Sequence, residues 1–285
     1  MISGTRYRLS LEINRQTTLA REIARAQAEI STGKRLQAPS DDPTAAARIS
    51  QLARAQADET AWISNLDSAA ALSERADIAL ESLSSRIDRA NELILSAASD
   101  TLSADNRETI ASELRGIAGE VAALADSKDP RGGDLFRVGD PLEIPVHAGG
   151  NIIPIASRDV IFGNIATAAG LTDLEAIISD AAAAITDPDD ATRKAATDAS
   201  IDAIKIASTH VAAIRGNHGV TAHRIEDMRE RLVQSGTQLT EQRTALESTD
   251  LVEAIARLQA KQLGLQAAQA VFARINQSTL FDLLR

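Results

Sequence analysis

Two adjacent carboxylates, Asp41 and Asp42, are the first residues of this chain that suggest chemistry. They lie in the segment APSDDPT, between Pro39 and Pro43. Paired carboxylates can hold a metal ion or act as general acid and base, but both roles need further groups that converge on the same point. No histidine or third carboxylate lies nearby in the sequence. An aspartate before a proline is typical of a helix start, because the carboxylate accepts hydrogen bonds from the first-turn amides. We therefore expect Asp41, Asp42 and Pro43 to form a helix cap.

The histidines do not form a pattern that predicts a metal site. His210, His218 and His223 fall on one expected helix, with spacings of eight and five, whereas two ligands on one helix face are four residues apart. The chain has no cysteine, which excludes disulfides, thiolate catalysis and cysteine metal sites. The glycine pairs in GGD and AGGN lack the lysine and the spacing of a phosphate loop. We expect no enzyme activity, no metal and no cofactor.

The spacing of apolar residues predicts long helices over most of the chain. Apolar residues recur at spacings of three and four over 44–98 and again after 185. The shorter run Ile110, Leu114, Ile117, Val121 and Leu124 has the 4-3-4-3 spacing of a helical bundle. A helix of about 55 residues would be roughly 80 Å long, so it must pack lengthwise against other helices. The sequence also predicts a second aspartate–proline helix start at Asp187-Pro188.

The two ends of the chain carry the most regular patterns. In the last segment one stripe is apolar, one neighbouring stripe is rich in amides, and both repeat every seven residues. We expect the apolar stripe to pack against the first helix in a paired terminal interface, formed by Leu19, Ile23, Ile30, Leu251, Leu258, Leu265 and Phe272. The amide stripe contains Gln262, Gln269 and Asn276.

A short β-rich insertion interrupts the helices at 132–163. The runs EIPV and IIPIA flank the turn signal Gly149-Gly150-Asn151, which indicates a hairpin. With only 2% aromatic residues, the chain as a whole favours long helical packing over a compact globular core. We predict a mainly α fold, an elongated helical bundle or coiled coil with this small insertion.

The chain divides into three expected regions. Residues 1–40 and 245–285 form a terminal helical domain, residues 41–130 and 180–244 a long-helix rod domain, and residues 131–179 an outward-facing β insertion. Charge follows the same division: the net charge of −10 combines +4 over 1–40 and +2 over 251–285 with an acidic body. An acidic body argues against nucleic acid binding. We also expect no membrane insertion and no cleavable signal peptide.

The ends of the chain resemble the flagellin family. The segment AQAEISTGKRLQAPSDDPTAAARIS carries the family's Ser-Thr-Gly-x-Arg turn at 31–35 and its Asp-Asp pair at Asp41 and Asp42. The segment 250–285 is similar to the family's other end, including the closing Leu-Leu. The forms PSDDP, GGDLFRVGD and TLFDLL are similar to the hook-associated branch of the family, which forms the hook–filament junction.

This resemblance implies a structural subunit of the bacterial flagellum that self-associates in a ring or tubular lattice. It implies contact with a neighbouring hook-associated protein and with flagellin, and export by the type III apparatus with a chaperone. The protein would then be secreted and lie at the extracellular hook–filament junction. The terminal helices would build the inner tube, and their ordering on assembly would couple folding to polymerisation.

The amide stripe and the stretch 31–43 each have two interpretations. Gln262, Gln269 and Asn276 either face the lumen of the tube or form hydrogen bonds between helices. The stretch 31–43, with Gly33 and Pro39, is either an adaptable joint between inner and outer layers or an ordinary loop. Two other functions also remain open for the whole chain: a self-polymerising filament flagellin, and a coiled-coil adhesin or adaptor that binds a ligand through the β insertion.

Overall fold

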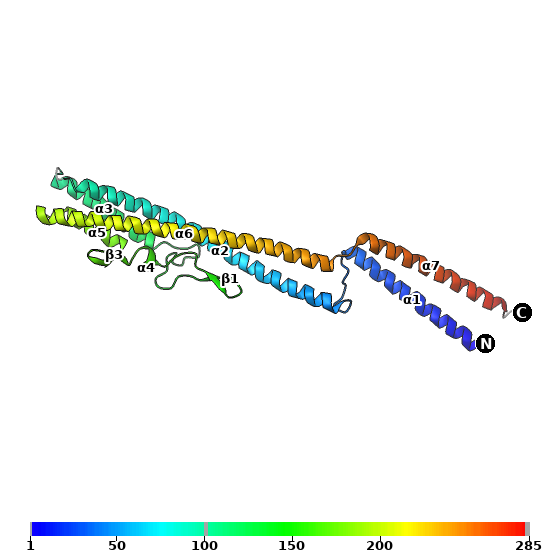
Figure 1. Ribbon diagram of the computed structural model, residues 1–285. Helices are drawn as coiled ribbons and strands as arrows, with labels where there is room; N and C mark the ends of the chain where they lie inside the picture. Colours follow the sequence, from blue (N-terminus) through cyan, green and yellow to red (C-terminus); the bar gives the residue numbers. More distant parts are fainter. Residues whose placement is uncertain (1, 100–101, 283–285) are drawn as a thin grey trace. The chain divides into compact units, whose positions relative to one another are not determined.

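The computed structural model describes residues 2–99 and 102–282, and these residues are mainly helical. In chain order the elements are α1 (Ile2–Thr32), α2 (Pro43–Ala97), α3 (Ala104–Ala125), β1 (Ile144–His147), β2 (Gly150–Ile152), α4 (Arg158–Ile161), β3 (Ile165–Thr167), β4 (Gly170–Thr172), α5 (Leu174–Ile185), α6 (Asp190–Glu247) and α7 (Leu251–Asp282). Figure 1 shows their arrangement. Among the described residues, none of the helices combines the length and the hydrophobicity of a membrane-spanning segment.

The chain divides into two compact units. One contains residues 1–57 and 236–285, and the other contains residues 58–235. The first unit thus holds α1 and α7 together with the adjoining ends of α2 and α6, while the second holds the rest of α2 and α6 with everything between them.

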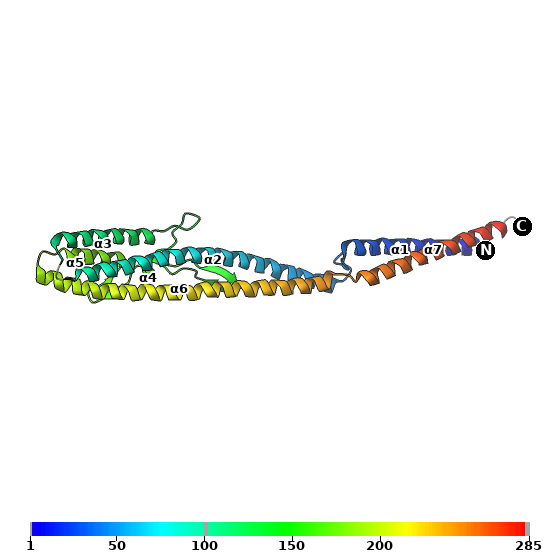
Figure 2. The same cartoon turned by 90° about the horizontal axis from the view of Figure 1, so that it is seen from above.

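The second unit is built around long helices and short helices packed on them. Its larger core contains residues of α2, α3, α5 and α6, among them Leu83, Ile94, Leu114, Ile178 and Ile204, all at most 1% exposed. Figure 2 shows α3 running along this group of helices. The buried residues of α3 and α5 follow a helical period, and they are all alanine, valine, leucine or isoleucine.

Helix α5 is absent from the layout predicted from the sequence, which placed its first half in the β insertion. Its buried residues are Leu174, Ile177, Ile178, Ala181, Ala182 and Ile185, which follow a helical period. The side chain of Asp173 caps the helix by accepting a hydrogen bond from the N–H of Ala176 at 2.7 Å. The prediction failed because the apolar run is short and follows closely on the strands.

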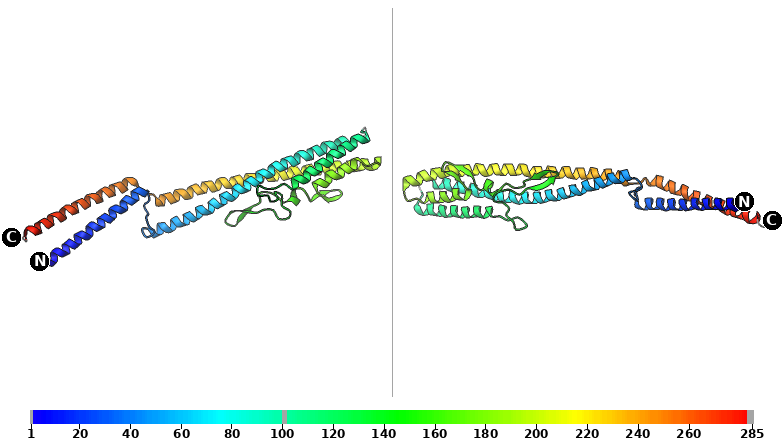
Figure 3. Two further views of the ribbon diagram at one scale, coloured as in Figure 1. Left: turned by 180° about the vertical axis from the view of Figure 1, so that it is seen from behind. Right: turned by 90° about the horizontal axis from the view of Figure 1, so that it is seen from below.

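The predicted hairpin is present as β1 and β2, which pair antiparallel with an irregularity between Pro145 and His147. A second hairpin, β3 and β4, was not predicted from the sequence. The first hairpin packs on the long helices through Ile144, Val146 and Ile152, which share a cluster with Leu66 and Ile225. Figure 3 shows the segment that carries both hairpins along one side of α2 and α6.

Two of the chain's four phenylalanines meet where this segment joins the main core. The rings of Phe136 and Phe162 lie 5.2 Å apart, edge to face, and both side chains are buried. An edge-to-face pair adds about 0.5–1.5 kcal/mol beyond the burial of its area. This pair therefore helps to fix irregular chain to the helical core.

The start of α6 differs from the prediction by two residues. Asp189, and not Asp187, caps the helix: its carboxylate accepts a hydrogen bond from the N–H of Thr192 at 2.8 Å. This bond is the main cause that lowers the pKa of Asp189. Asp187 instead accepts from the N–H of Asp189 at 2.9 Å, which shapes the turn before the helix.

Candidate assembly interface and joint

The first unit pairs the two terminal helices, α1 and α7. On α1 the covered positions include Leu19, Ile23, Ala26 and Ile30, with Ala26 fully buried and the others half-buried. These positions are spaced 4-3-4, so one stripe of the helix faces its partner. Within this unit the start of α1 and the end of α7 lie at the same end of the pair, so the helices are antiparallel (Figure 1).

On α7 the covered stripe is Ala254, Leu258, Lys261, Leu265, Ala268 and Phe272, spaced 4-3-4-3-4. Ala254 and Ala268 are buried, and Leu258, Leu265 and Phe272 are half-buried. The interface expected from the sequence contains neither alanine, although Ala254, Lys261 and Ala268 also recur every seven residues. Leu251 was expected in this stripe but is 48% exposed, because it begins the helix before the first covered turn.

Two ion pairs set the register of the terminal helices. Arg257 Nη2 lies 3.0 Å from Glu29 Oε1, and Lys261 Nζ lies 3.2 Å from Glu22 Oε2. Moving toward the C-terminus on α7, from Arg257 to Lys261, thus corresponds to moving toward the N-terminus on α1, from Glu29 to Glu22, as antiparallel packing requires. No sequence pattern marks these four residues, because charged side chains beside an apolar stripe are common on exposed helices.

The amide stripe of α7 is open to solvent in the single chain. Gln262 and Gln269 are both exposed, on a face of α7 other than its covered stripe. The side chain of Asn276 lies outside the described residues. The stripe is therefore available to a lumen or to another helix.

The two adjacent aspartates have separate structural roles. Asp42 Oδ1 accepts a hydrogen bond from the N–H of Ala45 at 3.0 Å, which caps α2 at its first residue, Pro43. Asp41 Oδ2 accepts from the N–H groups of Gln37 and Ala38, at 3.1 and 3.0 Å.

Asp41 also forms an ion pair with Arg25 of α1. The backbone hydrogen bond from Ala38 and the pairing with Arg25 lower the pKa of this carboxyl. Both aspartates thus accept hydrogen bonds that fix the backbone.

The other residues of the expected joint lie in the segment between α1 and α2. Gly33 has a φ of +66°, the left-handed conformation that glycine adopts without strain. Pro39 is exposed. The backbone of this segment is hydrogen-bonded to Glu247, the last residue of α6, and to Thr249, which follows α6.

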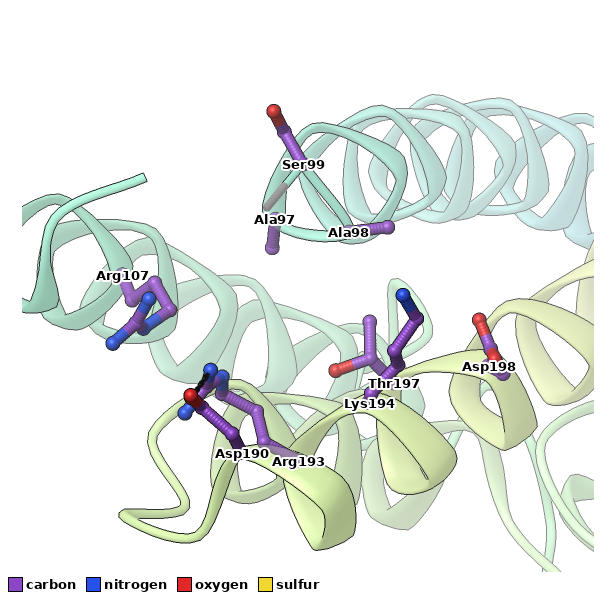
Figure 4. Close-up of a pocket in the computed structure, with 9 residues that line it drawn as sticks. All are labelled: Ala97, Ala98, Ser99, Arg107, Asp190, Arg193, Lys194, Thr197 and Asp198. Carbon is purple, nitrogen blue, oxygen red and sulfur yellow. Dashed lines mark hydrogen bonds and ion pairs between the residues drawn. The ribbon is translucent and has the colours of Figure 1, made fainter. Parts of the chain in front are cut away.

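The second unit contains a cavity lined by charged side chains. A cavity at the ends of α2, α3 and α6 is lined by Arg107, Asp190, Arg193, Lys194 and Asp198 (Figure 4). Arg193 pairs with Asp190 and also donates to the carbonyl oxygen of Asp187 at 3.2 Å. Within residues 2–99 and 102–282, no cluster of histidine and acidic residues is arranged to hold a metal ion.

His218 and His210 form hydrogen bonds with backbone carbonyl oxygens. His218 is buried, and its Nε2 lies 2.9 Å from the carbonyl oxygen of Ser73, which places the ring proton on this nitrogen. His210 similarly directs Nε2 to the carbonyl oxygen of Ile161 at 3.1 Å. Both histidines join α6 to other segments of the second unit.

Comparison with known families agrees with this arrangement of helices. Residues 9–137 match the bacterial flagellin N-terminal helical region, and residues 201–284 match the bacterial flagellin C-terminal helical region. The two matches together cover most of the chain and contain most of α1 and all of α7. The chain belongs to the flagellin family.

Two individual relatives within this family share one name, flagellar hook-associated protein 3. The chain is 26% identical to flagellar hook-associated protein 3 of Escherichia coli (strain K12), over 92% of this chain and 95% of that protein. It is 35% identical to flagellar hook-associated protein 3 of Salmonella typhimurium, over 38% of this chain and 34% of that protein.

Solved structures share the fold. FlgL of Xanthomonas campestris aligns with a TM-score of 0.59 at 16% identity, covering 67% of this chain and 99% of the other. Flagellar hook associated protein-3 of Legionella pneumophila aligns with a TM-score of 0.63 at 11% identity, covering 70% and 98%. Hence the fold is the mainly α, flagellin-like fold expected from the sequence.

Proposed function

We propose that this protein is a structural subunit of the bacterial flagellum that forms the hook–filament junction. The observation that carries the proposal is the similarity to flagellar hook-associated protein 3 of Escherichia coli, which extends over 95% of that relative. A match of this extent includes both terminal regions and the insertion between them, whereas similarity confined to the ends would fit any member of the flagellin family.

Assembly would use the paired helices α1 and α7. Their covered stripes are formed mainly by alanine, leucine and isoleucine, and several apolar side chains remain exposed on the same helices, including Leu11, Ile13, Val252 and Leu263. Exposed apolar side chains on paired helices can be buried by further copies in a ring or tubular lattice. The adjacent layers would be a hook-associated protein on one side and flagellin on the other.

The lumen-facing role of the amide stripe is part of this proposal. Gln262 and Gln269 would present neutral, hydrogen-bonding side chains to unfolded chains that pass through the tube, and Asn276 would extend the stripe. Neutral amides hold no net charge, so they would neither trap nor repel a passing chain of either sign. The competing role, hydrogen bonding between helices of neighbouring copies, would bury the same side chains.

Each of the three regions expected from the sequence would have its own place in the assembly. The terminal domain, residues 1–40 and 245–285, would form the inner tube. The long-helix domain, residues 41–130 and 180–244, would form the second layer, and the insertion at 131–179 would face outward. The subunit would reach this extracellular site through type III export with the help of a chaperone.

Immunogold microscopy of intact flagella tests the proposal. Antibodies raised against the insertion at 132–163 should label one position on each flagellum, where the hook meets the filament. Labelling along the whole filament would favour the alternative, a self-polymerising flagellin. Absence of label from flagella, with the protein detected elsewhere by the same antibody, would contradict both and favour an adhesin or adaptor.

A further inference from the structure

Two short connectors join the terminal helices to the long helices, and they are paired with each other. Residues 33–42 join α1 to α2, and residues 248–250 join α6 to α7. The N–H of Arg35 donates to the carbonyl oxygen of Glu247 at 2.8 Å, and the N–H of Thr249 donates to that of Gly33 at 3.1 Å. Lys34 and Ser248 form an antiparallel bridge between these two bonds.

A shielded carboxylate holds one side of this bridge. The side chain of Glu247 is only 17% exposed, and it accepts from Arg243 Nε at 2.6 Å and lies 3.1 Å from Lys34 Nζ. Arg243 is on the same helix, whereas Lys34 is on the other connector. These two cations, Arg243 first, lower the pKa of Glu247. Glu247 therefore ties the end of α6 to residues 33–42.

A second shielded carboxylate holds the other side. Glu29 of α1 is 15% exposed; its Oε1 accepts a hydrogen bond from the hydroxyl of Thr249 and lies 3.0 Å from Arg257 Nη2. Arg257 also lies 4.0 Å from Glu253 on its own helix. Glu29 therefore ties α1 both to the connector 248–250 and to α7.

A third carboxylate folds the longer connector back on α1. Asp41, at 16% side-chain exposure, pairs with Arg25 and accepts two backbone hydrogen bonds from the same connector. Ion pairs between fully exposed side chains contribute little, but loss of one partner from a shielded pair leaves a charge that water solvates poorly. In each pair the carboxylate is the less exposed partner. Glu247 joins the end of α6 to the connector 33–42, Glu29 joins α1 to the connector 248–250, and Asp41 folds the connector 33–42 back on α1.

We propose that the two connectors form one clasp, so that α1 and α7 can change direction relative to the adjoining ends of α2 and α6 only together. A subunit with this clasp keeps the α1–α7 pairing intact while its terminal helices adjust to different neighbours. The clasp depends on contacts within one chain and does not depend on what the chain assembles into.

Hydrogen exchange of the purified full-length chain tests the clasp through the amides of Arg35 and Thr249, which belong to different connectors. The Glu29→Gln variant removes a charge that contacts Thr249 and Arg257 but no residue of the connector 33–42. One clasp predicts that both amides exchange at least tenfold faster, by a similar factor. Independent connectors predict a change at Thr249 alone.

Glu247→Gln gives the complementary change, since it removes the charge that Lys34 faces, and it should also accelerate both amides together. Glu241→Gln makes the same change in charge at an exposed site of α6 and should alter neither. Backbone amides in the middle of α1 and α7, in the same unit as the connectors, and of α3, in the other unit, report that each variant is folded. Acceleration of one connector only, or of neither, in a folded variant would overturn the clasp; if one variant does not fold, the other decides by the same criterion.

Discussion

Lys34, in the connector 33–42, and Glu247, the last residue of α6, form an ion pair of 3.1 Å between segments that are far apart in the sequence. The pair stands beside the backbone hydrogen bond from Arg35 to Glu247, so side-chain and main-chain contacts join the same two segments. This relationship defines the region in which the terminal helices of the subunit meet its long helices.

Acid should weaken this region. The pKa values of Asp41 and Glu247 are lowered in the folded chain, so the unfolded chain binds protons more readily than the folded one. Their contribution to stability is then complete above the unfolded values of about 4 and is lost as the pH falls through the folded values. The midpoint of thermal unfolding, followed by far-ultraviolet circular dichroism, should change little between pH 7 and 5 and fall below pH 5.

The variant Glu247→Gln is the control for this pH dependence. It lacks one of the two carboxylates, so its midpoint should fall less between pH 5 and 3 than that of the unmodified chain. A midpoint that rises on acidification, or an equal fall in the variant, would contradict the assignment of this dependence to Glu247.

The helix cap at Asp42 should be measurable by substitution. Asp42→Ala removes the acceptor for the N–H of Ala45 and should lower the free energy of unfolding by about 1 kcal/mol. Asp42→Asn keeps an oxygen acceptor and should lower it much less, since asparagine caps helices about as well. Urea unfolding followed by circular dichroism makes the comparison. Equal losses in both variants would show that charge, and not capping, matters at this position.

Backbone conformation, and not lack of space, should determine how much a substitution of Gly33 changes the free energy of unfolding. A Cβ atom added at Gly33 or at Gly116 would meet no atom within 4 Å, but only Gly33 has a positive φ, +66°. Gly33→Ala should therefore destabilise the chain by about 1–2 kcal/mol. Gly116→Ala, within α3, should stabilise it by about 0.5–1 kcal/mol. The same urea titration measures both, and a neutral Gly33→Ala would contradict the need for a left-handed residue.

Charge in the amide stripe tests its proposed position in the lumen. The double variant of Gln262→Glu and Gln269→Glu should leave the purified subunit folded, because both side chains are exposed. A lumen position predicts normal incorporation of the variant into flagella and reduced export of flagellin through them. Blocked incorporation would instead place the stripe between helices, and unchanged incorporation and export would contradict a role in the lumen.

The sequence predicted the long helices and the terminal pair because their apolar periods are regular over many turns. Leu258, Leu265 and Phe272 recur every seven residues, and all three are half-buried on the α7 stripe. Asp42 could be recognised as a cap because its hydrogen bond lies within four residues, where local sequence determines geometry.

What the sequence did not predict depends on contacts between distant residues or on short segments. The bond from Arg35 to Glu247 uses backbone atoms, which no side-chain pattern marks. Helix α5 is brief, and its apolar residues resemble a continuation of the β insertion. The cap at Asp189 was assigned to Asp187 because Pro188 suggested the helix start, whereas three acidic residues around this proline all offer a suitable carboxylate.

Negative-stain microscopy of the full-length chain, under salting-out conditions and with short flagellin filaments as seeds, tests the junction role most directly. A junction subunit should form short stubs or caps on the seeds, without further elongation, since its partners differ on its two sides. Long filaments made of this chain alone would contradict the junction role and establish a self-polymerising flagellin.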